Sequence, residues 1–228
     1  LAESDANKNM FAMICEARLL PRFRDSDVYA KNSKAALLKL ADTGTVLWTP
    51  EGVYKHVFIY EGSPGKPILE EPKGAALGMK PEFVMQAFLN PVINALKELR
   101  DIDLYHGHIR LDNIYSASDD GSFDKVTLGD SLSLQAGYTD KTIYLAVHKA
   151  IAQPTGRGLG NISEDLYAMG VCAAIMLRSA DPAKNMTEQE VLRLKLAQGS
   201  YMTLTNKDRF SGGILELLRG LLQDDETQ

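Results

Sequence analysis

Residues 105–114 read YHGHIRLDNI, and the interpretation of the whole chain depends on this stretch. It contains His106, Gly107 and His108, and four residues separate His108 from Asn113. Histidine is the side chain whose charge changes near neutral pH, and an asparagine amide supplies an oxygen ligand. A short loop that carries both is a candidate functional site, and the segments on either side decide what kind of site it is.

Downstream of this loop, the sequence predicts a pair of strands and then helices. Short segments at 112–116 and 124–128 flank SASDDGSF, whose Asp-Asp-Gly suits a turn, and Asp130 follows the second of them. Residues 163–178 are apolar almost all round after a capped start at Ser163, as expected of a helix in the middle of a domain. Two amphipathic helices are predicted after it, at 187–197 and 211–223.

Upstream of the loop, a helix is predicted over 81–100, where apolar residues recur at intervals of three and four. Pro91 implies a kink or a break within it. Residues 62–81 are rich in glycine and proline and are predicted to connect two parts of the chain. Before them, a short helix is predicted from the candidate N-cap Ser33 to Gly44. The predicted strands of this part are 10–16, 45–49 and 54–61.

Two of these segments resemble parts of a protein kinase. The loop from His106 to Asn113 resembles the catalytic loop H-R-D-x-x-x-x-N, with its spacing kept. The segment VTLGD, which ends at Asp130, resembles the strand that delivers the magnesium-binding aspartate of D-F-G. In this alignment Gly107 stands in place of the arginine and His108 in place of the catalytic aspartate.

Two further segments resemble the same family. EDLYAMG (164–170) is similar to the D-x-W-x-x-G start of the central helix of the large lobe. The final helix is similar to the kinase helix that ends in L-L-x-x-D-P, but Asp225 stands in place of the proline. The resemblance covers residues 81–228 and implies an α+β, two-lobed, protein-kinase-like fold. It implies a small β-rich lobe with one helix at 1–62, a hinge at 63–81 and a helical lobe at 82–228.

Most of the groups required for phosphoryl transfer are missing from the sequence. The reaction depends on magnesium ions, a lysine on the phosphates, and a carboxylate that accepts the proton of the attacking hydroxyl. His108 lacks the negative charge of that carboxylate, and Asp112 lies four positions too late to replace it. No G-x-G-x-x-G occurs in residues 1–60. Lys31 is the nearest match to the V-A-I-K lysine, but it has no helix-borne glutamate partner and is predicted to be a solvated surface lysine.

The sequence therefore predicts a catalytically inactive protein-kinase-like domain, a pseudokinase that acts as a protein-binding or regulatory module of a larger protein. Asn113 and Asp130 are the vestige of a nucleotide site and would bind Mg²⁺ only together with ATP, so no cofactor is otherwise expected. In a purely structural interpretation, Asn113 bonds to neighbouring backbone and Asp130 caps a turn. The resemblance also implies that His106 packs between the cleft and the central helix, with the Asp165 carboxylate bonded to backbone amides of the loop.

Two other activities are compatible with the same residues. An atypical ATP-dependent kinase, or another phosphoryl or nucleotidyl transferase, would hold ATP through Asn113 and Asp130 and use His108 as its base. A metal hydrolase would use His106 and His108 as a metal pair, completed by the two other histidines of the chain or by carboxylates.

Composition limits the partners and the location of the protein. The chain has 228 residues, of which 45% are hydrophobic and 24% charged, and a formal charge of −5, so no broad basic surface for nucleic acid is expected. Cys15 and Cys172 lie in apolar surroundings, which favours buried thiols in a reducing compartment. No apolar run is long enough to span a membrane. We therefore expect a cytoplasmic segment that binds proteins and makes no membrane contact itself.

Overall fold

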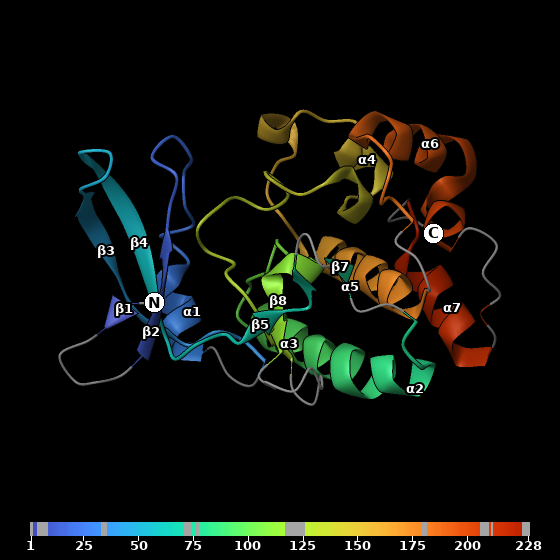
Figure 1. Cartoon of the computed structure of the whole chain (residues 1–228), viewed down its shortest axis with the longest axis horizontal. Coiled ribbons are helices and arrows are strands. Elements are labelled where there is room, and N and C mark those ends of the chain that lie inside the picture. The colour runs from blue at the N-terminus through green and yellow to red at the C-terminus, as the bar shows by residue number, and fades with distance from the viewer. Residues whose placement is uncertain are drawn as a thin grey trace.

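The computed structural model describes residues 2–3, 9–32, 36–70, 74–75, 78–116, 126–178, 182–205, 210 and 212–224. Within these residues the chain is α+β, with small antiparallel sheets toward the N-terminus and helices toward the C-terminus (Figure 1). The predicted class is confirmed at this level. Three features of the sequence lie outside the described residues, namely Ser33, the turn at 119–121 and Asp225.

The N-terminal part is built on a four-stranded antiparallel sheet. Its strands have the order β1-β2-β4-β3. Phe58 and Tyr60 are fully buried, as is Tyr29 on helix α1, and all three belong to the hydrophobic core. The elements are β1 (Ala2–Glu3), β2 (Asn9–Ile14), α1 (Ser26–Asn32), β3 (Leu40–Trp48) and β4 (Val53–Glu61).

The helix predicted over 33–44 is wrong. The helix of this region is α1, which ends at Asn32, and β3 begins at Leu40 and contains Gly44. Between the two elements, the carbonyl of Ala36 accepts a hydrogen bond from the last amide of β9 (Val126–Leu128) at 2.7 Å. A short apolar run fits either structure, and here the bond to a distant strand decides the outcome.

The glycine- and proline-rich connection contributes short strands beside the loop at 105–113. β5 pairs with β8, and β8 pairs with β9, which forms a three-stranded antiparallel sheet. β6 pairs with β7. The bounds are β5 (Lys66–Pro67), β6 (Leu69–Glu70), β7 (Gly74–Ala75) and β8 (Ile114–Ser116).

The helix predicted over 81–100 is present and runs through Pro91 without the predicted break, with a π-helical turn directly before it. α2 (Pro81–Phe83), the π-helical turn Val84–Leu89 and α3 (Asn90–Arg100) follow one another without a gap. The amide of Asn90 donates to the carbonyl of Met85, five residues earlier. Pro91 has no N–H and lies in the first turn of α3, where the missing donor costs least.

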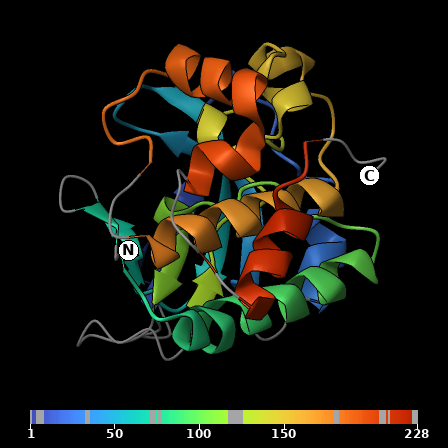
Figure 2. The ribbon, with the colours of Figure 1, turned by 90° about the vertical axis from the view of Figure 1, so that its right-hand side faces the viewer.

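Helix α5 (Ile162–Leu177) lies at the centre of the helical part. It is buried along most of its length and packs against α3, α6 and α7 (Figure 2). Its N-cap is Asn161, two residues before the predicted cap, because Asn161 Oδ1 accepts the amide of Glu164 at 2.9 Å. This buried helix is the support on which the loop at 105–113 rests.

The remaining helices follow the predicted order. α6 is longer than predicted and is interrupted at Gly199, whose φ is 79°. None of the described helices combines the length and the apolar character needed to cross a membrane. The helices are α4 (Val147–Ala150), α6 (Glu188–Thr205) and α7 (Gly212–Leu221), with 3-10 turns at Leu111–Asn113, Thr142–Tyr144 and Pro154–Gly156.

Candidate functional site

Pairing of β8 with β9 brings the two candidate magnesium ligands of the sequence together. Ile114, the first residue of β8, lies opposite Leu128, the last residue of β9. Asn113 precedes this strand pair and Asp130 follows it. The Nδ2 atom of Asn113 donates a hydrogen bond to the backbone carbonyl of Asp130 at 2.9 Å, so the two residues are direct neighbours.

The side chain of Asn113 is held by backbone groups. Its Nδ2 atom also donates to the carbonyl of His108 at 2.9 Å, so both N–H groups of the amide are used. The amide packs against Gly129, where an added Cβ would lie 2.1 Å from Asn113 Oδ1. Only glycine fits there. The buried amide therefore ties the loop to the end of β9, which is the backbone-bonded arrangement considered for Asn113 from the sequence.

The carboxylate of Asp130 is occupied by protein groups. Its Oδ1 accepts a hydrogen bond from the hydroxyl of Tyr60 on β4 at 2.6 Å. The amides of Leu132 and Ser133 donate to Oδ1 and Oδ2 at 3.3 and 3.0 Å, so the aspartate also caps a turn. Burial and the charge of Asp130 raise the pKa of Tyr60 well above its ordinary value, which keeps its hydroxyl a donor. Asp130 is only 5% exposed.

Removal of the Tyr60 hydroxyl is expected to destabilise the protein. Tyr60→Phe keeps the ring in the core but removes the shortest hydrogen bond that Asp130 accepts. A hydrogen bond to a buried charged group contributes about 2 kcal/mol to the free energy of unfolding. Urea denaturation measures the loss. Tyr54→Phe is the matched control on the same strand, because Tyr54 is 71% exposed and its change should leave the midpoint where it is. Equal midpoints for Tyr60→Phe and the unchanged protein would contradict this bond.

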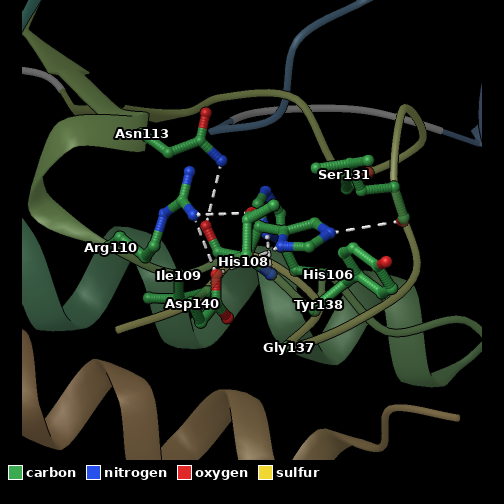
Figure 3. A network of polar contacts seen from close by, with 12 residues as sticks. His106, His108, Ile109, Arg110, Asn113, Ser131, Gly137, Tyr138 and Asp140 are labelled. Carbon is green, nitrogen blue, oxygen red and sulfur yellow. Dashed lines mark hydrogen bonds and ion pairs between the residues drawn. The ribbon is translucent and has the colours of Figure 1, made fainter. Parts of the chain in front are cut away.

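His108 stands where the resemblance has the catalytic aspartate, and both of its ring nitrogens face oxygen atoms. Nε2 lies 3.2 Å from the carbonyl oxygen of Leu134, and Nδ1 lies 3.4 Å from Oδ1 of Asp140 (Figure 3). These oxygens accept and do not donate, and a neutral ring carries one N–H, so a neutral ring hydrogen-bonds only one of them at a time. His108 is 3% exposed. Both ring nitrogens therefore face protein oxygens in a buried position and are directed away from solvent.

Asp140 links the loop to the segment that follows Asp130. Its Oδ1 accepts a hydrogen bond from Nη1 of Arg110 at 2.9 Å and also faces His108 (Figure 3). Burial raises the pKa of Asp140, but the hydrogen bonds and charges of His108 and Arg110 outweigh burial and hold that pKa below its ordinary value. Arg157 donates to backbone carbonyls of the same segment, that of Asp140 among them. The segment is thus clamped from two sides.

Asp165 joins His106 and the loop to α5. Its carboxylate accepts hydrogen bonds from the amides of His106 and Gly107 at 2.6 and 2.7 Å, which is the contact that the resemblance implies. The Nε2 atom of His106 lies 3.2 Å from the carbonyl oxygen of Gly129. Burial raises the pKa of Asp165 to about 7, although the hydrogen bonds from the two amides lower it. Burial lowers the pKa of His106 to about 3. The His106 ring is therefore neutral, and it packs between the loop and the residue that follows β9.

Gly107 adopts a backbone conformation that no arginine would favour. Its φ is +83°, in the left-handed region that glycine tolerates best. An added Cβ would lie 2.8 Å from the Cβ of Ala136. An arginine side chain at this position would therefore require the backbone or Ala136 to move.

Gly107→Ala is expected to lower the free energy of unfolding by about 2 kcal/mol, because a strained φ and crowding act together. Gly52→Ala is the matched control: Gly52 has a φ of +66° but nothing within 4 Å of an added Cβ, so this variant reports the backbone cost alone. Urea denaturation of both variants provides the comparison. If both lost the same amount of stability, the contact with Ala136 would carry no cost and the prediction would be wrong.

Arg22 is a site residue that the sequence did not single out. Its guanidinium lies 3.9 Å from the centroid of the Tyr105 ring, and its Nε pairs with Asp25 at 2.9 Å. The available signal was ARLLPRFRDSD (17–27), a run with three arginines that fits no predicted element. Nη1 of Arg22 donates at 3.0, 3.1 and 3.0 Å to the backbone carbonyls of Tyr105, His106 and Ser131. The side chain therefore links the N-terminal part to both segments of the site.

Lys195 on α6 is a second residue that sequence reasoning missed. It is 1% exposed and donates to the hydroxyl of Tyr167 at 2.9 Å. That hydroxyl donates to Ser200 at 2.6 Å, and Ser200 donates to Asp224 at 2.5 Å. Burial lowers the pKa of Lys195 to about 7, against the charges of Asp224 and Glu188. Nζ of Lys195 also donates to the backbone carbonyls of Thr142, Ile143 and Leu145.

The remaining candidates from the sequence are not brought to this site. Lys31 is exposed in the last turn of α1 and does not belong to a strand. Among the residues that the structure describes, no group of three or more His, Cys, Asp or Glu side chains is arranged to hold a metal ion. The rings of His106 and His108 are engaged with protein groups, while His56 lies on β4 and His148 on α4. The predicted metal pair is therefore not supported in this part of the chain.

In comparisons with known proteins, no family model matches the chain and no curated protein has a matching sequence, so the site is interpreted from its own geometry.

Proposed function

We propose that this chain is a protein-kinase-like, two-lobed domain that does not transfer phosphate, a pseudokinase that serves as a protein-binding or regulatory module. Its order of elements supports this proposal. A small sheet with one helix is followed by a connection, and then by a helical part in which a loop and a strand pair carry the candidate residues. In this proposal the connection acts as the hinge and the partners are other proteins.

The proposal rests chiefly on the hydrogen bonds and the burial of the Asp130 carboxylate. In the family, this aspartate binds the magnesium ion that bridges the phosphates. Here its oxygens accept hydrogen bonds from Tyr60, Leu132 and Ser133, and it is almost fully buried. Tyr60 reaches it from the N-terminal sheet, so the same contact that satisfies the carboxylate also occupies the space between the two parts of the chain.

The lysine and glutamate that align the phosphates have no counterparts in the elements where the family carries them. The family places the lysine on a strand and the glutamate on the helix that follows. In this chain β2 precedes α1, and β2 contains no lysine and α1 no glutamate. The residue after β2 is Cys15, which is buried, and burial together with the charge of Asp130 raises its pKa to about 12. A neutral thiol thus lies near Asp130 in place of a cation.

The alternative, an atypical transferase that holds ATP through Asn113 and Asp130, needs His108 as a base. A general base must have a lone pair within reach of the proton that it removes. Both nitrogens of His108 face protein oxygens, and its ring is buried. This geometry favours the pseudokinase over the transferase.

Phosphate transfer provides the test. The purified chain is incubated with Mg²⁺, a general protein acceptor and ATP labelled at the α- or the γ-phosphate, so that nucleotidyl and phosphoryl transfer are both detected. We expect no label on the chain or on the acceptor above the level of the His108→Gln variant. Transfer by the unchanged protein that is lost in His108→Gln and kept in Tyr54→Phe would overturn the proposal in favour of the transferase.

A further inference from the structure

We propose that the free edge of strand β3 is a docking surface for a second copy of this chain, through antiparallel strand pairing. β3 is the last strand in the sheet order, and its pairing within the described residues is with β4 alone. In Figure 1 it lies on the left-hand side of the sheet, beyond β4. Backbone N–H and C=O groups on an open edge are a template for another strand, which fixes the kind of occupant. This inference goes beyond the proposed function and does not depend on it.

Beyond Asp42, whose Oδ1 accepts the amide of Thr43 at 2.8 Å, the edge lacks the features by which proteins usually protect open strands. Short length, charged residues, proline and bulges all block strand addition. β3 has nine residues, and its single irregularity of register lies at its start, between Leu40 and Asp42. From Thr43 to Thr49 the sequence reads TGTVLWT, without a charge or a proline. This stretch is regular, uncharged and rich in residues that favour strands.

Apolar side chains are exposed on both faces of the β3–β4 ribbon near this edge. Val46 and Leu47 on β3 are 40% and 51% exposed, and Val53 and Tyr54 on β4 are 39% and 71% exposed. Successive residues of a strand point to opposite faces, so Val46 and Leu47 lie on different faces. A partner that lay on one face would bury only half of this apolar surface. A strand added at the edge would cover part of both faces.

A second copy fits this edge because the uncharged stretch is complementary to itself. Two copies related by a two-fold axis pair antiparallel through the same residues, so one contact satisfies both edges. With no charged residue in 43–49, no like charges come opposite each other, although the chain carries a formal charge of −5. The cross-strand pairs at the interface would then be formed by threonine, valine and tryptophan side chains of the two copies.

Sedimentation equilibrium of the whole chain tests the proposal, with two variants and a control. Val46→Lys and Leu47→Lys each place a charge on the edge, one on each face. The control is Leu159→Lys, which changes a side chain that is 75% exposed in the helical part. We expect the unchanged protein and the control to form dimers with equal affinity. Each edge variant should weaken dimerisation about tenfold or more, since the axis repeats the change, and should keep the melting temperature of the unchanged protein at concentrations where both are monomeric.

Amide hydrogen exchange gives an independent reading without any substitution. In the unchanged protein, exchange within 43–48 should slow as the protein concentration rises, while exchange at exposed amides of α7 should not. A protein that is monomeric at every concentration would overturn the proposal. The edge would then be a docking surface only for a strand of another protein. Weakening by only one of the two edge variants would also overturn it, because that result indicates contact through one face.

Discussion

Replacement of Lys195 by methionine is expected to lower the free energy of unfolding by about 3 kcal/mol or more. Methionine keeps the volume of the side chain but removes the amine that bonds three backbone carbonyls and the Tyr167 hydroxyl in a buried position. Those acceptors would remain without water or donors, and each unsatisfied buried group costs about 1–3 kcal/mol. Urea denaturation measures the change.

Arg193→Met on the same helix is the matched control for this variant. Arg193 is exposed, so its loss should shift the midpoint by less than about 0.5 kcal/mol. Amide exchange adds a local reading, because the segment from Thr142 to Leu145 should exchange faster only in the Lys195 variant. A Lys195→Met protein as stable as the control would mean that the carbonyls of this segment do not need the amine.

The same lysine gives the stability a defined dependence on pH. Its pKa falls from an ordinary value near 10.5 to about 7 in the folded protein, so the folded state binds this proton less tightly than the unfolded state. Between about pH 7 and pH 10 the unfolded chain therefore carries more protons, and the contribution of Lys195 to stability rises with pH. The Lys195→Met variant should lack this rise. Midpoints of urea denaturation at pH 7 and pH 9.5 test it, and an equal rise in both proteins would assign it to another group.

Asp165→Ala is expected to destabilise the protein by about 3 kcal/mol, because it leaves the amides of His106 and Gly107 without an acceptor in a site that is 2% exposed. The effect should be local as well as global. The loop would lose the two hydrogen bonds that tie it to α5 at His106 and Gly107. Nuclear magnetic resonance should report large shifts of the loop amides, and urea denaturation should report the loss of stability.

Ser163→Ala provides the control for Asp165, since Ser163 lies exposed in the first turn of the same helix and does not act as its cap. Asp165→Asn gives a graded comparison. Its amide keeps one acceptor oxygen but turns an NH₂ group toward the second backbone N–H, so we expect it to lose stability as well. If both Asp165 variants matched Ser163→Ala, the hydrogen bonds to the loop would contribute nothing measurable.

The local elements around the site could be predicted from the sequence. Strands were predicted at 112–116 and 124–128, and the structure has β8 and β9 there. That Asn113 and Asp130 belong to one site was implied by the resemblance, and the two residues are hydrogen-bonded neighbours. An irregularity near Pro91 could be expected from the missing amide of proline, which is a local property, and the structure has a π-helical turn before it and no break. The buried character of 163–178 follows from its composition, because a helix that is apolar all round has to be surrounded by other elements.

The contacts that close the site could not be predicted in the same way. Tyr60 and Asp130 are 70 positions apart, and Arg22 lies 83 positions before Tyr105. Such pairs depend on the packing of the two parts of the chain, which leaves no periodic signal. The helix predicted over 33–44 failed for a related reason, since its apolar residues bond to β9, which lies far along the sequence. The closeness of Ala136 to Gly107 likewise has no signal in the neighbouring sequence.

The proposed pseudokinase implies that the site no longer accepts a nucleotide, because the Asp130 carboxylate and both N–H groups of the Asn113 amide are hydrogen-bonded to the protein. Calorimetric titration of the purified chain with ATP and Mg²⁺ tests this most directly. With nucleotide in the millimolar range, we predict only the heat of dilution, and no rise in melting temperature, whereas a ligand at 100 times its Kd would add about 2.7 kcal/mol of stability. Saturable binding of one nucleotide per chain, abolished in Asp130→Asn, would contradict the account.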